Sequence, residues 1–308
     1  MLHVGLLDAM HREGAVDVAA FADKEGLDRT LVVGICEALF ARRVLQKEGA
    51  TRFRLDQLGR LIMDERMARG WFELAYGYEP VLHRMEDLVR KKAAYGRDVV
   101  RDGVAVAVGS GLASVSFTFP MVADGIARAG YKKVLDLGCG DGAFLRLLAE
   151  RIPGIRGVGI DLSPEAVENG NQAMAAKGLA DRFRLHVGDA AKLDTMAEAL
   201  AGVDAVTTFF VLHEIPKSPD HRATVEFLKM FRLVLPGIPF VIVETDRPAP
   251  EELRAKPGFA IEYFLFHDLS GQQALSRATW KDLFRQVGFT SISEEYIGFT
   301  RISIFTVK

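Results

Sequence analysis

The residues with the clearest potential for chemistry are histidines and acids that follow apolar segments. An apolar run at 205–212 ends in His213 and Glu214, Glu244 ends a second apolar run, and His267 lies in a later segment. Histidine titrates near neutrality, so a histidine oriented by an acid can act as a general base. Two histidines and a carboxylate can instead hold a metal ion and leave coordination positions open for substrate. Both chemistries are consistent with these residues.

A glycine-rich turn predicts a second site, for a nucleotide-like ligand. Residues 134–142 read as an apolar strand that runs into this turn, where Gly138 and Gly140 let the backbone approach a ligand closely. Asp136, just before the turn, is placed to receive a cationic group. Asp161 ends the next apolar strand, which is where an acid binds the hydroxyls of a ribose.

Strands and helices alternate from residue 132 onward, which predicts a mostly parallel, doubly wound α/β sheet. Ligands of such a sheet bind beyond the carboxyl ends of the strands, where the glycine turn and His213 lie. The last two strands follow each other without a helix and predict a terminal hairpin. The predicted strands are 132–137, 156–161, 183–187, 204–210, 239–244, 292–297 and 301–307. The predicted helices are 141–151, 163–178, 193–201, 221–234 and 278–287.

The order of these motifs resembles that of a known family. A strand leads into Asp-Leu-Gly-Cys-Gly at 136–140, a helix and a strand lead to Asp161, and Gly-Asp-Ala at 188–190 follows a third strand. Over roughly residues 130–308 this series resembles the class I S-adenosylmethionine-dependent methyltransferases, whose first motif reads D-x-G-x-G. The resemblance implies a seven-stranded, Rossmann-like methyltransferase fold.

The resemblance also implies a set of cofactor-binding residues. Gly138 and Gly140 would line the methionine part of S-adenosylmethionine. Asp161 would hold its ribose, and Asp189 would hold its adenine amino group. The remaining residues of the expected cofactor site are Asp136, Leu162, Ala190 and Phe210.

His213 supports two further resemblances, to different methyltransferase groups. A histidine followed by an acid at this strand end is similar to plant-type O-methyltransferases, where His213 would be the general base, oriented by an acid such as Glu244. With Glu214 and His267, it resembles the α-keto acid C-methyltransferases that act on phenylpyruvate or 2-ketoarginine. There the three side chains would bind iron or zinc, which would activate the β-carbon of a keto acid by stabilising its enolate.

We favour the C-methyltransferase interpretation, because an O-methyltransferase needs no second histidine at 267. Two features bear on this choice. Glu214 in place of Asp is a departure from that group, and its additional methylene leaves coordination or a supporting role open. Side chains of neighbouring strand residues point in opposite directions, so a metal site on His213 and Glu214 requires a sharp turn there.

Residues 1–130 are predicted to form a mainly helical domain ahead of a catalytic domain at 131–308. Helices are expected at 16–22 and from Arg29 to about Gln46, with a wing strand at 52–55 and a mostly helical stretch at 65–130. The glycines between 103 and 111 indicate a backbone packed closely against either another helix or the cofactor. A winged helix suggests DNA binding, which arginines would support: Arg29, Arg42, Arg43, Arg52 and Arg54.

Small-molecule methyltransferases carry such a domain for dimerisation and substrate capping, and we expect a homodimer formed through it. The 308-residue chain has a net charge of −2, which does not favour binding of a polyanion. A small-molecule substrate is therefore expected rather than nucleic acid. A non-catalytic dimeric regulator is the third hypothesis.

Two cysteines and the lack of a signal peptide or a long apolar run predict a cytoplasmic protein that does not enter the membrane.

Overall fold

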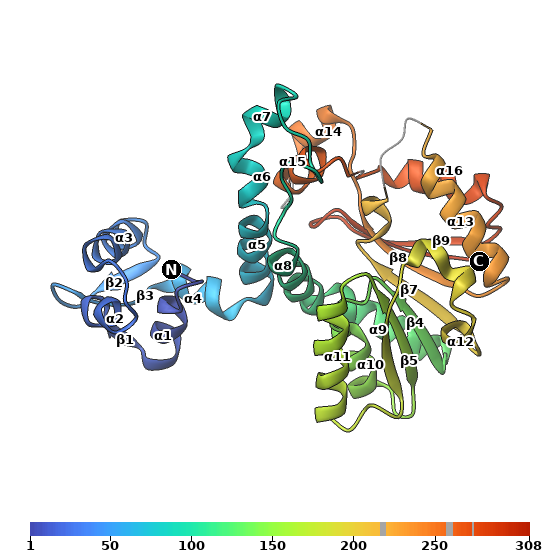
Figure 1. The fold of residues 1–308 in the computed structure, drawn as a ribbon, viewed down its shortest axis with the longest axis horizontal. Coiled ribbons are helices and arrows are strands. Elements are labelled where there is room, and N and C mark those ends of the chain that lie inside the picture. Colours follow the sequence, from blue (N-terminus) through green and yellow to red (C-terminus); the bar gives the residue numbers. More distant parts are fainter. Residues whose placement is uncertain (216–219, 257–260, 273) are drawn as a thin grey trace. The chain divides into compact units, whose positions relative to one another are not determined.

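A computed structural model describes residues 1–215, 220–256, 261–272 and 274–308, without the side chains of residues 197 and 198 (Figure 1). The chain divides into two compact units. The first comprises Met1–Tyr76 and Val108–Ser116, and the second comprises Gly77–Ala107 and Phe117–Lys308. The separation of a catalytic domain at residue 131 stays a prediction.

The first part of the chain forms a small helical core closed by an antiparallel sheet. Its strands are ordered β1-β3-β2, and its buried side chains include Leu6, Val18 and Phe53. The elements are α1 (Leu6–Glu13), β1 (Ala15–Asp17), α2 (Val18–Lys24), α3 (Arg29–Ala41), β2 (Leu45–Lys47), β3 (Arg52–Leu55) and α4 (Gln57–Asp64).

Two predicted helices of this part have wrong bounds. The helix expected at 16–22 begins at Val18, because Ala15–Asp17 pairs with β3 and the Asp17 carboxylate accepts hydrogen bonds from the first turn of α2. The helix expected to reach Gln46 ends at Ala41. Arg43 takes a left-handed φ of 59°, and the chain then enters β2, where buried Leu45 pairs with Leu55.

The stretch from 65 to 130 is mostly helical, as predicted, and one of its glycines mediates helix packing. An added Cβ at Gly109 would lie 2.6 Å from the Gly70 carbonyl oxygen and 2.5 Å from the Leu74 nitrogen. This glycine is therefore packed against another helix.

Among the described residues no single helix is long and apolar enough to span a membrane, and α8 with α9 reaches that length only as a pair bent by 57°. The helices are α5 (Arg66–Gly77), α6 (Glu79–His83), α7 (Met85–Val89), α8 (Gly103–Ser116) and α9 (Thr118–Ala129).

A seven-stranded sheet of order β6-β5-β4-β7-β8-β10-β9 forms the centre of the second unit (Figure 1). Every neighbouring pair is parallel except those of β10, which runs antiparallel to both β8 and β9. The predicted doubly wound sheet with a terminal hairpin is confirmed. The strands are β4 (Lys133–Leu137), β5 (Arg156–Asp161), β6 (Phe183–Val187), β7 (Ala205–Phe209), β8 (Phe240–Thr245), β9 (Ile292–Ile297) and β10 (Ile302–Val307).

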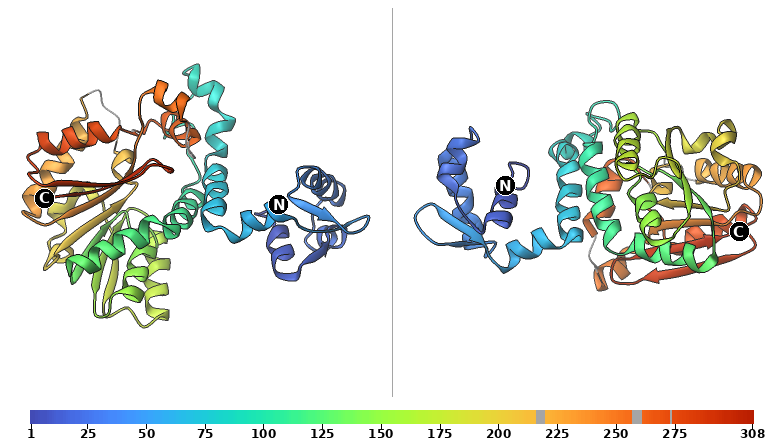
Figure 2. Two further views of the ribbon diagram at one scale, coloured as in Figure 1. Left: turned by 180° about the vertical axis from the view of Figure 1, so that it is seen from behind. Right: turned by 90° about the horizontal axis from the view of Figure 1, so that it is seen from below.

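Helices cover both faces of this sheet (Figures 1 and 2). On one face Phe231, Phe284 and Trp280 pack on strand residues in the main hydrophobic core, while α9, α10 and α11 cover the other. The helix predicted at 193–201 is instead a 3-10 turn and a short helix. The helical elements are α10 (Ala143–Arg151), α11 (Pro164–Ala176), η1 (Ala190–Thr195), α12 (Ala197–Leu200), η2 (Leu212–Glu214), α13 (Arg222–Val234), α14 (Pro250–Ala255), α15 (Ile261–Leu269) and α16 (Arg277–Gln286).

Candidate active site

The glycine turn after β4 packs against Val211 at Gly138 and faces open space at Gly140. Gly138 and Gly140 have left-handed φ values of 71° and 54°, which glycine adopts without steric cost. An added Cβ at Gly138 would lie 2.3 Å from Val211, whereas one at Gly140 would meet nothing within 4 Å. The Gly140 N–H donates a hydrogen bond to Asp161 Oδ2 at 2.8 Å. The predicted glycines and the predicted ribose acid therefore lie together at one edge of the sheet.

The other predicted cofactor residues follow neighbouring strands at the same edge. Asp189 and Ala190 come directly after β6, and the Asp189 carboxylate accepts a hydrogen bond from the Ala191 N–H. Leu162 is exposed immediately after β5, and Phe210 directly follows β7 with a left-handed φ of 57°. Because parallel strands end side by side, these residues surround the glycine turn.

Asp136 lies beneath this turn as a buried acid. Its carboxylate accepts a hydrogen bond of 2.8 Å from the Thr207 hydroxyl on the adjacent strand β7. Burial, reinforced by the charge of Asp161, raises the pKa of Asp136 to about 7. A cationic ligand beside it would stabilise its ionised form, as expected for the residue before the turn. Thr207 was not predicted, because nothing in its sequence context distinguishes it from other strand residues.

His213 and Glu244 form a buried pair at the ends of β7 and β8. His213 Nδ1 lies 2.8 Å from Glu244 Oε2, and each residue is only 1% exposed. Burial opposes protonation of the imidazole, but the Glu244 carboxylate outweighs it and raises the pKa of His213. An ionised carboxylate only accepts hydrogen bonds, so we assign the Nδ1 proton to His213. Its Nε2 is then left to face the site.

His267, on α15, points its own Nε2 at that of His213. The two Nε2 atoms are 3.0 Å apart, and the Nδ1 of His267 lies 2.5 Å from the carbonyl oxygen of Tyr263. A carbonyl can only accept, so this Nδ1 also carries its proton. When His213 is protonated, its Nε2 can donate a hydrogen bond to His267 Nε2; when both imidazoles are neutral, their lone pairs face each other, an arrangement that a cation between them would stabilise. Burial and the nearby charge of His213 lower the pKa of His267 well below its ordinary value, so His267 resists protonation.

Tyr263 adds a hydroxyl group to this pair. Its oxygen lies 3.3 Å from His213 Nε2, and its ring centroid is 3.9 Å from that of His267. Sequence reasoning named the segment but missed this residue. The signal was present, since residues four apart share one face of a helix and Tyr263 precedes His267 by that spacing.

Glu214 is turned away from the histidines. The 3-10 turn η2 directs its side chain to Arg101, whose Nη2 lies 2.5 Å from Glu214 Oε1. Arg101 also donates a hydrogen bond to the Tyr78 hydroxyl, which in turn lies 3.2 Å from the Gln272 side-chain oxygen. The three predicted metal ligands are thus not brought together. Among the described residues, no three His, Cys, Asp or Glu side chains form a group that could hold a metal ion.

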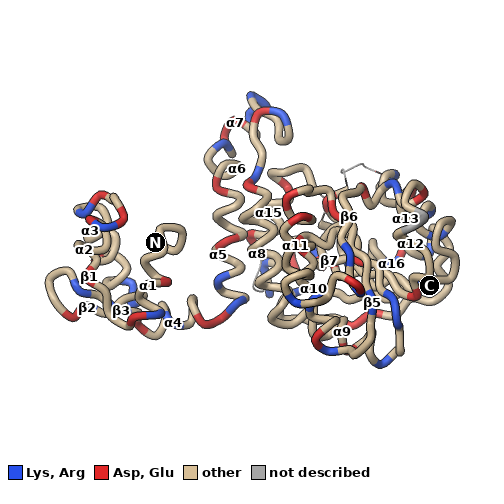
Figure 3. Tube along the Cα trace, turned by 60° about the horizontal axis from the view of Figure 1, so that its bottom comes forward, with Lys and Arg blue, Asp and Glu red and all other residues tan. Residues whose placement is uncertain are grey.

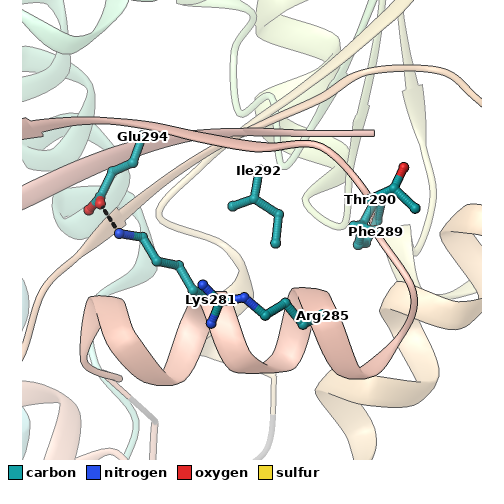
Figure 4. Close-up of a pocket in the computed structure, with 6 residues that line it drawn as sticks. All are labelled: Lys281, Arg285, Phe289, Thr290, Ile292 and Glu294. Carbon is teal, nitrogen blue, oxygen red and sulfur yellow. Dashed lines mark ion pairs between the residues drawn. The ribbon is translucent and has the colours of Figure 1, made fainter.

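A pocket of about 510 Å³ on α16 and β9 lies at the other end of the sheet (Figure 4). Its Ile292 pairs with Val307, which pairs with Phe240 at the start of β8, whereas Glu244 lies near the end of that strand. The pocket therefore does not belong to the histidine site. It is lined by Lys281, Arg285, Phe289, Thr290, Ile292 and Glu294.

Residues 130–287 match a family model described as a methyltransferase domain. The chain belongs to this methyltransferase family. It is a class I S-adenosylmethionine-dependent methyltransferase, as the order of its motifs predicted.

Relatives of this methyltransferase extend over most of the chain. The methyltransferase ungE' of Aspergillus campestris is 25% identical over 98% of this chain and 89% of its own length. The 2-ketoarginine methyltransferase of Streptomyces arginensis is 28% identical over 90% of this chain and 79% of its own.

Solved structures share the methyltransferase fold. The mitomycin 7-O-methyltransferase MmcR aligns with a TM-score of 0.71 and 18% identity, covering 100% of this chain and 91% of that one. Human N-acetylserotonin methyltransferase aligns with a TM-score of 0.73 and 16% identity, covering 99% and 91%. At these identities the likeness shows the fold.

We expect Asp161→Ala to weaken S-adenosylmethionine binding by about 1.5–3 kcal/mol, the range for a hydrogen bond to a charged group. Asp161 lies above the glycine turn and accepts the Gly140 N–H, so its carboxylate is in place for the ribose hydroxyls. Isothermal titration calorimetry measures the change. Asp141→Ala is the matched control, because this exposed acid of the same turn pairs with Arg146. Equal affinity of Asp161→Ala and the unmodified protein would rule out the ribose assignment.

We expect Asp136→Asn to stabilise the cofactor-free methyltransferase more at pH 8 than at pH 5. The pKa of this carboxyl rises from 3.8 to about 7 on folding, so its favourable contribution is complete below 3.8 and is lost as pH rises through 7. The variant cannot ionise at this position, so its gain in stability at pH 8 should exceed its gain at pH 5 by about 2–3 kcal/mol. Urea unfolding at both pH values measures the difference. Equal gains would show that Asp136 titrates normally.

Proposed function

We propose that this methyltransferase methylates the β-carbon of a small α-keto acid, with a metal ion held by His213 and His267. The observation that carries the proposal is the pair of imidazole nitrogens 3.0 Å apart, each with its other nitrogen committed as a donor. The relative named 2-ketoarginine methyltransferase supports the substrate class.

The histidine pair fits a metal ion. Nitrogens bound to one metal at about 2.0–2.1 Å lie roughly 2.8–3.4 Å apart for right-angled to tetrahedral arrangements, so a spacing of 3.0 Å is suitable. Both imidazoles have the supporting partners that metal-bound histidines use, a carboxylate for His213 and a backbone carbonyl for His267. These partners fix the tautomers that leave Nε2 available for the metal.

Arg101 fits the carboxylate of the substrate. Its side chain is mostly buried and is held by Tyr78, while its present partner Glu214 is 40% exposed on the side chain. A guanidinium binds a carboxylate through a fixed fork of donors. We assign Arg101 to the substrate carboxylate, which would take the place of Glu214.

In the proposed reaction the β-carbon loses a proton, gains the methyl group and forms a new carbon–carbon bond. S-adenosylmethionine supplies the methyl group from its sulfonium sulfur and leaves as S-adenosylhomocysteine. A metal ion held by His213 and His267 would supply Lewis-acid polarisation of the keto oxygen. The substrate carboxylate would displace Glu214 from Arg101. We assign Glu214 as the base that accepts the β-proton. Glu244 holds His213 in place and takes no part in the proton transfer.

Hydrogen exchange tests the proposal directly. The metal-loaded enzyme, without S-adenosylmethionine, should exchange the β-hydrogens of 2-ketoarginine or phenylpyruvate with deuterated water, which NMR detects. A chelator should stop the exchange, and Glu214→Gln should stop it while the metal stays bound. Methylation of phenols by chelated enzyme, with no exchange of either keto acid, would overturn the proposal.

O-methylation is the second candidate function, and the His213–Glu244 pair favours it. A histidine oriented by a carboxylate is the arrangement of a general base that deprotonates a hydroxyl. Two observations weigh against it. The free Nε2 of His213 faces His267 and Tyr263 rather than an open approach, and the raised pKa of His213 reduces the fraction of neutral base.

We also propose that the methyltransferase is a homodimer formed through its N-terminal part. Helix α3 exposes apolar side chains along one stretch, with Leu31 63% and Ile35 43% exposed. Basic and acidic residues are interspersed along this part (Figure 3). Arg29 pairs with Asp23, and Arg54 pairs with Glu48, which leaves less positive charge for DNA. These observations favour a dimer over the regulator hypothesis.

The double variant Leu31→Glu, Ile35→Glu should convert the dimer to monomers. Each apolar side chain contributes about 1.5–3 kcal/mol when buried, so their loss should raise the dimer Kd by at least about 100-fold. Analytical ultracentrifugation measures the change, with Thr30→Glu on the same helix as the control for added charge. An unchanged dimer would place the interface elsewhere. Tight, sequence-specific DNA binding at physiological salt would revive the regulator hypothesis.

A further inference from the structure

Arg101 is fixed to Tyr78 through both side chain and backbone. Its Nη1 donates a hydrogen bond of 2.9 Å to the Tyr78 hydroxyl oxygen, and its Cζ lies 5.7 Å from the centroid of the same ring. The backbone N–H of the next residue, Asp102, donates to the carbonyl oxygen of Gly77 at 2.8 Å. The Asp102 carboxylate also accepts hydrogen bonds from the first turn of α8. The two segments that carry Arg101 and Tyr78 are therefore held against each other.

Tyr78 is in turn bonded to the segment that carries His267. The Tyr78 oxygen accepts from Arg101, so its proton is free for the side-chain oxygen of Gln272, which lies 3.2 Å away. The backbone N–H of Gln272 donates to the His267 carbonyl oxygen at 2.8 Å. The Tyr78 ring stacks on Phe266 with the ring centroids 4.7 Å apart. Tyr78 and Gln272 are 1% and 8% exposed, so water competes little for these hydrogen bonds.

This arrangement prepares Arg101 for an anion. An arginine side chain is long and flexible, and its planar fork of donors matches a carboxylate only when it is correctly oriented. Tyr78 uses one of the five N–H donors, which leaves others for a carboxylate. The hydroxyl is a neutral acceptor, so it orients the guanidinium without neutralising its charge. A carboxylate that displaces Glu214 would therefore meet an arginine already held in place.

We propose that Tyr78 is a positioning residue of the acceptor site, whose hydroxyl orients the Arg101 guanidinium for the carboxylate of the substrate. Gln272 fixes that hydroxyl by accepting its proton. The inference rests on the assignment of Arg101 in the proposed function and does not involve the metal ion. It goes beyond that assignment because recognition of the carboxylate depends on a residue that acts only through Arg101.

Calorimetric binding of keto acids measures this role apart from catalysis. The full-length protein, saturated with S-adenosylhomocysteine so that no methyl transfer occurs, is titrated with phenylpyruvate and with 2-ketoarginine. Tyr78→Phe keeps the ring that stacks on Phe266 and should weaken keto acid binding by about 10-fold, the net effect of one hydrogen bond. Tyr131→Phe is the matched control and should leave binding unchanged, because this tyrosine precedes β4, at the opposite end of that strand from the glycine turn.

A double-mutant cycle separates positioning from a general structural effect. In Arg101→Lys the positive charge remains but the fork of donors is lost, so adding Tyr78→Phe should change the affinity by less than about 2-fold. A purely structural role of Tyr78 would weaken binding by the same factor in both backgrounds. Gln272→Met removes the acceptor of the Tyr78 proton and should show the same dependence on Arg101. This variant decides the case if Tyr78→Phe does not fold.

The proposal is overturned if neither keto acid binds the unmodified protein, if Tyr78→Phe binds as tightly as the unmodified protein, or if the losses in the two backgrounds are equal. An equal loss of affinity in Tyr131→Phe would overturn it as well. Failure of the proposed function looks different. The keto acids would then bind in a manner that depends on Tyr78, but their β-hydrogens would not exchange and they would not be methylated.

Discussion

On the proposed metal site, His267→Ala is expected to abolish metal binding and to reduce methylation by about 10²–10³-fold, the range for losing one preorganised electrostatic group. The Nε2 of His267 lies 3.0 Å from His213 Nε2, so the variant would leave the proposed metal ion with only one of its two histidines. Affinity for S-adenosylmethionine should be unchanged, because Asp161 and the glycine turn are separate from this pair. Metal analysis, turnover and calorimetry measure the three quantities.

The same variant separates the two candidate functions. An O-methyltransferase that uses His213 as its base would stay active in His267→Ala and would lose activity in His213→Ala. Chelators would have no effect on such an enzyme. The control is His186→Ala, because this histidine lies within a different strand, β6, and has no expected role in the site. Activity of His267→Ala within a few-fold of the unmodified enzyme would contradict the metal interpretation.

Glu244→Ala is expected to destabilise the protein by about 3–5 kcal/mol, the usual cost of removing one partner from a buried ion pair. The carboxylate accepts from the His213 ring at 2.8 Å and from the His213 backbone N–H at 3.3 Å, and both residues are buried. Alanine would leave these two donors without an acceptor and would also leave a cavity. Urea unfolding of the metal-free protein measures the loss of stability.

Glu244→Gln separates the charge of this residue from its hydrogen bond. The amide oxygen can still accept from His213 Nδ1, so the loss of stability should be much smaller than for alanine. Removing the charge should nevertheless weaken metal binding by about 10–100-fold, the usual cost of changing a partner of a metal-bound histidine. A glutamine variant with unchanged metal affinity would show that Glu244 serves stability alone.

Local sequence patterns were sufficient to predict the fold of the second unit and the position of its cofactor loop. The left-handed backbone at positions 138 and 140 favours glycine, and the alternation of apolar strands with helices predicts a doubly wound sheet. Parallel strands all end at one edge, so the predicted residues after β4, β5 and β7 had to gather there. Periodicity and turn chemistry act over short distances, and the sequence displays them directly.

Only the tertiary structure decided which side chains meet at the histidine site. Nothing near Glu214 in the sequence indicates that it pairs with Arg101, which lies far away along the chain. Long-range packing likewise set the end of α3, since Leu45 joins a strand once Leu55 is available beside it. The contact of Tyr263 with His213 depends on where α15 packs over the sheet edge. Such contacts arise from packing between distant elements, and a single sequence carries no local signal for them.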